Sequence, residues 1–190
     1  MVIVPPLTPR YDKNSVYERL HVEPGSAAWE YNEEIFPDVM QEIMDRLCIH
    51  DCILVTDRRL VTGVEEIDRA EKQVICMIAI EQNVMDKMDE YLADYDFPEA
   101  YLLDQMVNEI LFNAGDDLSR AAEKTMREKG LGLTRRYIPG DDPLPLEAQA
   151  QMLDCLKETE EASVLSVSER GALRPEKAAL YLFGADPAYV

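Results

Sequence analysis

The spacing of hydrophobic residues changes along the chain from a helical to a strand-like period. Apolar residues recur at every fourth position over residues 33–47, which predicts a helix with one buried face. Residues 48–56 predict a strand, and residues 72–80 form a nearly continuous apolar run. Such a run is typical of a strand that is buried on both faces. Thr62 and Gly63 predict a turn between the two strands.

The clearest predicted element is a long amphipathic helix in the middle of the chain. A shorter helix is expected first, at about residues 82–94. Asp96 is then a candidate N-cap, and apolar residues recur at three- to four-residue spacing as far as Lys129. Gly130 is the expected stop signal, and Gly115 marks a candidate bend or break.

The segment after the long helix combines a strand, a turn and another helix. Residues 131–137 predict the strand, and residues 139–143 predict the turn because they contain Pro-Gly and a second proline. Pro145 and Glu147 open the helix. Its predicted buried face consists of Ala150, Leu153 and Leu156.

The two ends of the chain complete the predicted architecture. Residues 163–168 alternate as a strand does, residues 170–175 predict a loop, and residues 177–184 predict a last strand. Residues 1–32 contain several prolines and no persistent apolar period, so we expect an irregular N-terminal arm packed on one domain of residues 33–190. The order of elements predicts an α+β fold: a twisted, mainly antiparallel sheet with flanking helices, one of them long.

The net charge narrows the range of partners. The 190 residues include 38 acidic and 19 basic side chains, which gives a formal charge of −19. Such a surface repels phosphate backbones and anionic lipid, so we expect neither nucleic acid nor a membrane as a partner. A basic protein or a cationic ligand would suit the charge, and solubility alone would also account for it.

The cysteines and the first residues indicate a cytoplasmic protein. Residues 1–6 lack the basic and long apolar parts of a secretory signal, and no apolar run approaches the ~20 residues of a membrane span. We therefore expect reduced thiols in a cytoplasm. The cysteines concerned are Cys48, Cys52, Cys76 and Cys155.

Few residue patterns suggest catalysis. The chain contains no glycine-rich phosphate-binding motif, no Gly-x-Ser-x-Gly turn and no His-Glu-x-x-His motif. Cys48, His50 and Cys52 would share one face of a strand, which resembles half of a metal site. Buried thiols beside a core histidine explain the same pattern, and we assign no metal ligand. Among the adjacent acidic pairs, Asp141 and Asp142 are the candidate contacts to a ligand or a metal ion, because they lie in the Pro-Gly turn.

The turn that follows the predicted strand carries the strongest candidate chemistry. Arg136 ends the strand and offers a forked cation suited to a carboxylate. Pro139 and Gly140 then turn the chain, and glycine allows backbone groups to approach a ligand closely. These parts could bind a small zwitterion. An ordinary turn with a surface arginine remains the alternative.

Around this turn the chain carries an ordered set of features: an Arg-x-x-Pro-Gly turn, a Pro-Leu-Glu-x-Gln helix start, a strand, a loop with a proline, and a final strand. They lie at residues 136–140, 145–149, 167–168, 173–177 and 178–184. The set resembles the activation (reactivation) domain of cobalamin-dependent methionine synthase, and in particular the free-standing small proteins of that family. The resemblance is clear over residues 131–187 and looser over residues 70–187.

The resemblance implies a surface groove for S-adenosylmethionine, a zwitterion with a sulfonium cation. It implies ligand contacts for Arg136, Tyr137, Ile138, Pro139, Gly140, Asp141 and Tyr189. Cobalamin is expected only through a partner, a corrinoid protein or methyltransferase, because the chain has no Asp-x-His-x-x-Gly motif. The implied function is to support reductive remethylation of that corrinoid, as an accessory to methionine synthase-type methyl transfer in methionine biosynthesis. Whether the chain is itself an enzyme stays open.

Two other functions also stay open. Asp141 stands where the family commonly has a tyrosine, so the alternative is a non-catalytic interaction module of the same fold whose S-adenosylmethionine site has drifted. The third is an unrelated small-molecule enzyme that holds a divalent metal ion with Asp141 and Asp142. The long helix has broad apolar coverage and therefore also permits a homodimer.

Overall fold

The protein is built on a five-stranded sheet in which all neighbouring strands are antiparallel. The computed structural model describes residues 1–157, 159–168 and 171–190. Every residue of the central strand after Lys72 is buried, which confirms the prediction of a strand covered on both faces. The strands lie in the order β1 (Val2–Ile3), β2 (Ile49–Thr56), β3 (Lys72–Ile80), β7 (Ala178–Asp186) and β4 (Gly132–Leu133).

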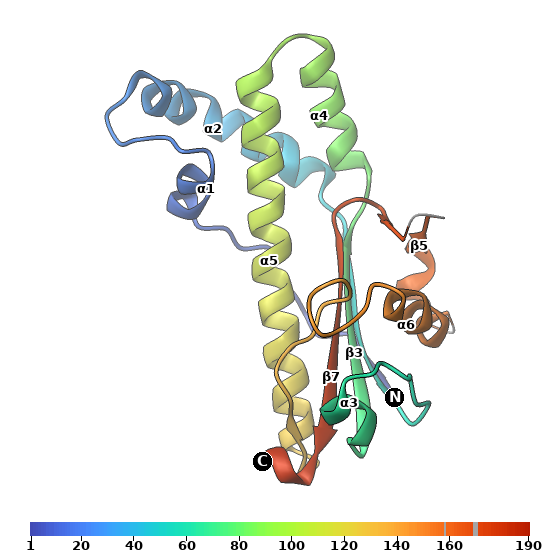
Figure 1. Cartoon of the computed structure of the whole chain (residues 1–190). Coiled ribbons are helices and arrows are strands. Elements are labelled where there is room, and N and C mark those ends of the chain that lie inside the picture. The colour runs from blue at the N-terminus through green and yellow to red at the C-terminus, as the bar shows by residue number, and fades with distance from the viewer. Residues whose placement is uncertain (158, 169–170) are drawn as a thin grey trace.

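Helix α5 covers one face of the sheet, and three further helices pack on α5 and share its hydrophobic core (Figure 1). The longest, α5, has 31 residues and is therefore roughly 46 Å long. It packs on β3 and β7 with one half, and on the other helices with the half that extends past the sheet (Figure 1). The four are α1 (Lys13–Arg19), α2 (Ala27–Arg46), α4 (Asn83–Ala93) and α5 (Phe97–Arg127).

The opposite face of the sheet is covered by shorter elements, which enclose a second hydrophobic cluster. They are α3 (Glu65–Arg69), α6 (Ala148–Leu156), the short helix η1 (Glu161–Val164) and the hairpin of β5 (Ser166–Val167) and β6 (Leu173–Arg174). A last short helix, η2 (Pro187–Tyr189), follows β7. This arrangement confirms the predicted α+β class with a mainly antiparallel sheet, flanking helices and one long helix.

The expectation of irregular structure over residues 1–32 is wrong for three segments. Strand β1 pairs with β2, and α1 begins after Asp12, whose side chain accepts a hydrogen bond from the Asn14 N–H. Val16 is fully buried against the long helix. Helix α2 begins before the expected boundary, since the Ser26 side chain caps it by accepting from the Trp29 N–H. The division into an arm and a domain stays a prediction.

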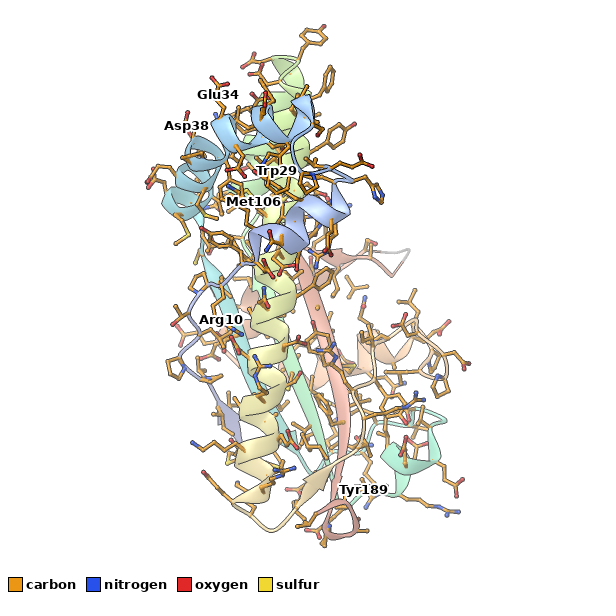
Figure 2. The ribbon with its side chains drawn as sticks, turned by 90° about the vertical axis from the view of Figure 1, so that its left-hand side faces the viewer. Arg10, Trp29, Glu34, Asp38, Met106 and Tyr189 are labelled. Carbon is orange, nitrogen blue, oxygen red and sulfur yellow. The ribbon has the colours of Figure 1, made fainter. Side chains whose placement is uncertain are left out.

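Aromatic packing explains why the N-terminal segment is ordered. Tyr17 of α1 meets Trp29 of α2 edge to face, with ring centroids 4.7 Å apart, and also packs edge to face on Phe36. Figure 2 shows Trp29 and Met106 in the region where α1 and α2 cross α5. A helix as short as α1 is unstable alone, so this contact with the core is what fixes it.

Several predicted boundaries also change. Asp96 precedes α5, but its side chain makes no capping hydrogen bond. Helix α5 runs through Gly115 without a break. The strand expected at 163–168 is reduced to β5, the loop expected at 170–175 contains β6, and residue 170 lies outside the described residues. The buried face of α6 is Ala148, Gln149, Met152 and Leu156, so Ala150 was placed wrongly and Leu153 is only partly covered.

Within the part of the chain that the structure describes, no helix is both long and apolar enough to cross a bilayer.

Candidate functional site

The segment after β4 is a strand interrupted by one extra residue. Leu133 pairs with Ala185, so an unbroken antiparallel ladder would place Tyr137 opposite Tyr181. Tyr137 pairs with Leu182 instead, through two hydrogen bonds of 3.0 and 2.9 Å. The extra residue is a β-bulge at Arg135 and Arg136, and it is the reason why the predicted strand 131–137 is wrong beyond Leu133.

The bulge turns its two arginines toward different layers of the molecule. Arg136 lies toward α5: its Nη1 is 2.6 Å from Asp116 Oδ1, and its guanidinium lies 4.7 Å from the Tyr181 ring centroid. Burial raises the pKa of the Tyr181 hydroxyl, and the Arg136 charge partly offsets this. Arg135 lies on the other side, with its guanidinium 4.7 Å from the Tyr137 ring centroid.

The Pro-Gly turn has a closed pattern of backbone hydrogen bonds. The Gly140 N–H donates to Leu144 O at 3.0 Å, and the Asp141 N–H donates to Ile138 O at 3.0 Å. Gly140 has a φ of +94°, which glycine tolerates and other residues rarely adopt. Both N–H groups are therefore already used inside the turn in this conformation, and the ligand contacts expected for Gly140 and Asp141 stay a prediction.

A pocket of about 600 Å³ lies beside the turn, on the side of Arg135. It joins the bulged segment to α3 and to η2, although these parts are far apart in sequence. Tyr137 and Tyr189 line it, which brings together two of the predicted site residues; Tyr189 lies at the end of the molecule near α3 (Figure 2). The full lining is Gly63, Val64, Glu65, Glu66, Arg69, Arg135, Tyr137, Pro143 and Tyr189.

The other predicted site residues do not line this pocket. Arg136 faces α5, Ile138 and Pro139 are partly buried, and Gly140 and Asp141 are exposed. In their place the pocket has charged residues of both signs. Arg69 Nη1 lies 2.5 Å from Glu65 Oε1, and Arg135 Nε lies 3.9 Å from Glu66 Oε1. These side chains are well exposed, so the pairs are weak and can exchange for a ligand.

Helix α3 and the loop before it were not predicted, yet they form one wall of the pocket. The Asp68 carboxylate fixes the loop by accepting from Thr62 N–H, Thr62 Oγ1 and Gly63 N–H at 2.8–3.0 Å, which confirms the predicted turn there. Gln73 of β3 adds two hydrogen bonds to the backbone of Leu60. A helix of five residues is too short to show a hydrophobic period, and the acidic start and basic end of α3 were the only signals in the sequence.

The candidate metal ligands are rearranged relative to the sequence pattern. Cys52 is fully buried, whereas Cys48 and His50 converge with Glu81, which follows β3. Among the described residues these three form the one group of Cys, His, Asp or Glu side chains close enough to share an ion. Asp141 and Asp142 belong to no such group and are exposed, so the structure does not favour a metal site there.

Comparisons with known proteins identify the architecture. No protein-family model and no curated protein matches the sequence. The structure is similar to a crystal structure of the MetH reactivation domain bound to AdoHcy, with a TM-score of 0.64 and 12% sequence identity, over 90% of this chain and 70% of that chain. The resemblance seen in the sequence is therefore confirmed at the level of the fold, and the chain has the fold of the MetH reactivation domain.

Proposed function

We propose that the chain binds S-adenosylmethionine beside the turn after α5 and supports the reductive remethylation of a corrinoid carried by a partner protein. The shared fold supports this, because the similar MetH domain was crystallised with AdoHcy, the demethylated form of that compound. The observation that carries the proposal is the pocket beside the turn, where Arg135, Tyr137 and Tyr189 meet the charged residues of α3.

The pocket has a complementary group for each part of the ligand. Arg135 can bind the carboxylate as a fork. Glu65 and Glu66 suit the ammonium and the sulfonium cations, and the aromatic faces of Tyr137 and Tyr189 suit the sulfonium or the adenine. A volume of about 600 Å³ lies in the usual range for small-molecule sites.

The proposal modifies the role expected for Arg136. Its guanidinium is held by Asp116 and lies over Tyr181, away from the pocket, so we assign the carboxylate contact to Arg135. Pro139 and Gly140 then shape the turn that places Pro143 in the pocket wall. Asp141 is exposed at the same turn, where it is available to a docked partner.

Isothermal titration with S-adenosylmethionine and AdoHcy tests the binding step, with Arg135→Gln and Arg136→Gln as a matched pair of neighbours. A hydrogen-bonded charge contributes about 1.5–3 kcal/mol, so Arg135→Gln should weaken binding by roughly tenfold or more, and Arg136→Gln by much less. If only Arg136→Gln weakens binding, the ligand lies on the α5 side, and Asp116→Asn should then strengthen it. No binding at ~1 mM ligand would sink the proposal.

The corrinoid step needs a separate measurement. A corrinoid methyltransferase inactivated to the cob(II)alamin state should return to methylcobalamin when the chain, S-adenosylmethionine and a one-electron reductant are supplied together. The absorption spectrum of the corrinoid reports this directly. Equal recovery with Arg135→Gln protein would contradict the link between the pocket and the reaction.

The second candidate is an interaction module of the same fold. It is favoured by the internal pairing of Arg136 with Asp116 and by the closed hydrogen-bond pattern of the turn. In that case a corrinoid protein is captured equally well by the wild type and by both arginine variants, with or without S-adenosylmethionine. Capture that requires the ligand would exclude this candidate.

A further inference from the structure

Three different metal-binding side chains meet at the far end of the sheet from the pocket. Cys48 immediately precedes β2, His50 lies within it, and Glu81 immediately follows β3. The Cys48 Sγ is 3.5 Å from His50 Nε2, and the same nitrogen is 2.8 Å from Glu81 Oε1. All three ligand atoms lie within 4.8 Å of one another, and all three residues are half-buried.

The backbone holds these residues in place without any help from the side chains. Ile49 pairs with Ile80 and His50 pairs with Ala79, so the ends of β2 and β3 are in register. The Glu81 N–H donates to the Cys48 carbonyl at 3.0 Å, which fixes Cys48 and Glu81 across the two strands. Only side-chain torsions therefore need to change for the three ligand atoms to share an ion.

The distances are close to those of a tetrahedral zinc site. Bonds of about 2.3 Å to sulfur and about 2.05 Å to nitrogen put those two atoms about 3.5 Å apart, and nitrogen and carboxylate oxygen about 3.4 Å apart. The observed sulfur–nitrogen distance is 3.5 Å. The nitrogen–oxygen distance of 2.8 Å is that of a hydrogen bond and must open by roughly 0.6 Å, which the 41%-exposed Glu81 side chain allows.

We propose that Cys48, His50 and Glu81 form a binding site for a divalent transition-metal ion of the zinc type. Thiolate and imidazole together select zinc-like ions over magnesium and calcium, which prefer oxygen ligands. His50 binds through Nε2, the nitrogen that faces the other two ligands, and therefore carries its proton on Nδ1 when the ion is bound.

The site leaves one coordination position for a ligand from solution. Three protein ligands with an open fourth position distinguish reactive zinc sites from closed structural ones. Glu81 also lines a pocket of about 480 Å³ with Gln82, Asn83, Val164, Ser166, Arg174 and Pro175. Water or a small anion that reaches Arg174 can therefore approach the ion. This site lies at the opposite end of β3 from the S-adenosylmethionine pocket and does not depend on it.

Cobalt substitution tests the proposal, because a cobalt ion bound by a thiolate in a tetrahedral site has a characteristic absorption spectrum. The full chain, reduced, freed of metal with a chelator and without an affinity tag, is titrated with Co²⁺ and then with Zn²⁺ in competition. Excess Mg²⁺ and Ca²⁺ are present throughout to occupy surface carboxylates. We expect one ion per chain, a thiolate-to-cobalt charge-transfer band, and its loss when Zn²⁺ displaces Co²⁺.

Matched variants identify the ligands. Cys48→Ser should abolish the charge-transfer band and weaken Zn²⁺ binding by more than about 100-fold, since loss of even a supporting residue costs about 10–100-fold. Cys155→Ser, at the other half-buried thiol, should leave both unchanged. His50→Gln should weaken binding, whereas His21→Asn, at the other histidine, should not. Glu81→Gln should also weaken Zn²⁺ binding, and because its side chain is 41% exposed, this third variant carries little risk of misfolding.

Three results would overturn the proposal. They are the absence of a thiolate band in the wild type, a band that survives Cys48→Ser, and a band that disappears in Cys155→Ser. Circular dichroism of each variant shows whether it is folded. A fourth result, a folded Glu81→Gln protein that binds Zn²⁺ as tightly as the wild type, would overturn the three-ligand site as well. Binding of S-adenosylmethionine, measured on the same samples, should be unaffected by all of these variants.

Discussion

A Cβ atom on Gly115 would lie 2.4 Å from the hydroxyl oxygen of Tyr181. The two residues join the middle of α5 to β7, and Tyr181 is also the ring beneath the Arg136 guanidinium. Gly115 is therefore a point of close approach between the long helix and the sheet. The sequence suggested a bend here, but the glycine makes room for an aromatic ring instead.

Gly115→Ala should destabilise the protein although alanine favours helix more than glycine. The gain in helix propensity is about 1 kcal/mol, whereas overpacking a buried contact costs about 1–3 kcal/mol. Two further ring atoms of Tyr181, at 2.9 and 3.0 Å, would also be too close, so we expect the cost to lie in the upper part of its range and the net loss to reach about 2 kcal/mol. The midpoint of urea unfolding measures it. In the double variant with Tyr181→Phe the loss should be smaller, and an equal loss would show that the clash is elsewhere.

A buried ammonium group at the start of β7 gives a second prediction. Lys177 Nζ is 2.5 Å from Asp104 Oδ1 and 2.9 Å from Asn108 Oδ1, and its side chain is only 9% exposed. Asp104→Ala would leave the charge without its carboxylate and should cost about 1–3 kcal/mol of unfolding free energy. Lys177→Met should cost less, because it removes the charge as well.

The control for this pair is an exposed one on the same helix. Arg127 and Glu123 of α5 form an ion pair with side chains 68% and 47% exposed, so Glu123→Ala should change the unfolding free energy by less than about 1 kcal/mol. Chemical denaturation of the four proteins gives the comparison. A larger effect of Lys177→Met than of Asp104→Ala would mean that the packing of the lysine stem, rather than its charge, stabilises this contact.

The long regular elements could be predicted because burial determines their pattern. The apolar run of β3 is buried on both faces, and the 3–4 residue period of α5 matches its buried stripe. Strand β7 was also predicted, although it extends two residues further than expected. In these segments the local pattern and the tertiary environment agree, which is the condition under which sequence reasoning works.

The details of the candidate site could not be predicted for two reasons. The bulge at Arg135 and Arg136 depends on the register with β7, which no local signal specifies, so the sequence did not show that Arg135 faces the pocket and Arg136 faces α5. The metal-ligand group needs the pairing of β2 with β3 to bring Glu81 to His50, residues far apart in the sequence. Both features come from contacts between strands that a single sequence does not reveal.

A buried carboxyl group should make stability depend on pH. Asp51 is 7% exposed, its Oδ1 has no hydrogen-bond partner among the described residues, and burial raises its pKa to about 6, with Glu161 adding to the shift and His50 opposing it. The unfolded chain releases this proton near pH 4, so between about pH 4 and 6 the folded state binds more protons than the unfolded state. The contribution of Asp51 to the unfolding free energy should therefore fall as the pH rises from about 4 to about 6, and it should stay constant at higher pH.

Asp51→Asn isolates this effect in protein freed of metal with a chelator. Relative to the wild type, the variant should gain about 2–3 kcal/mol of unfolding free energy on going from pH 4 to pH 7, because it has no proton to release. Asp38→Asn, on the exposed face of α2, is the control for an aspartate-to-asparagine change. A difference between Asp51→Asn and wild type that is the same at both pH values would contradict the buried-acid interpretation.

The four thiols should differ in reactivity according to their burial. Cys52 and Cys76 are fully buried, and burial raises the pKa of Cys52 to about 12 and that of Cys76 strongly as well. Cys48 and Cys155 are half-buried, and burial also raises the pKa of each, so they should react slowly but measurably at pH 8.

With a water-soluble aromatic disulfide in the presence of a chelator, we expect two thiols to react in the native protein and four in urea. The double variant Cys48→Ser with Cys155→Ser should show none until it unfolds. Rapid modification of a third thiol in the wild type would show that the central strands open far more readily than their complete burial indicates.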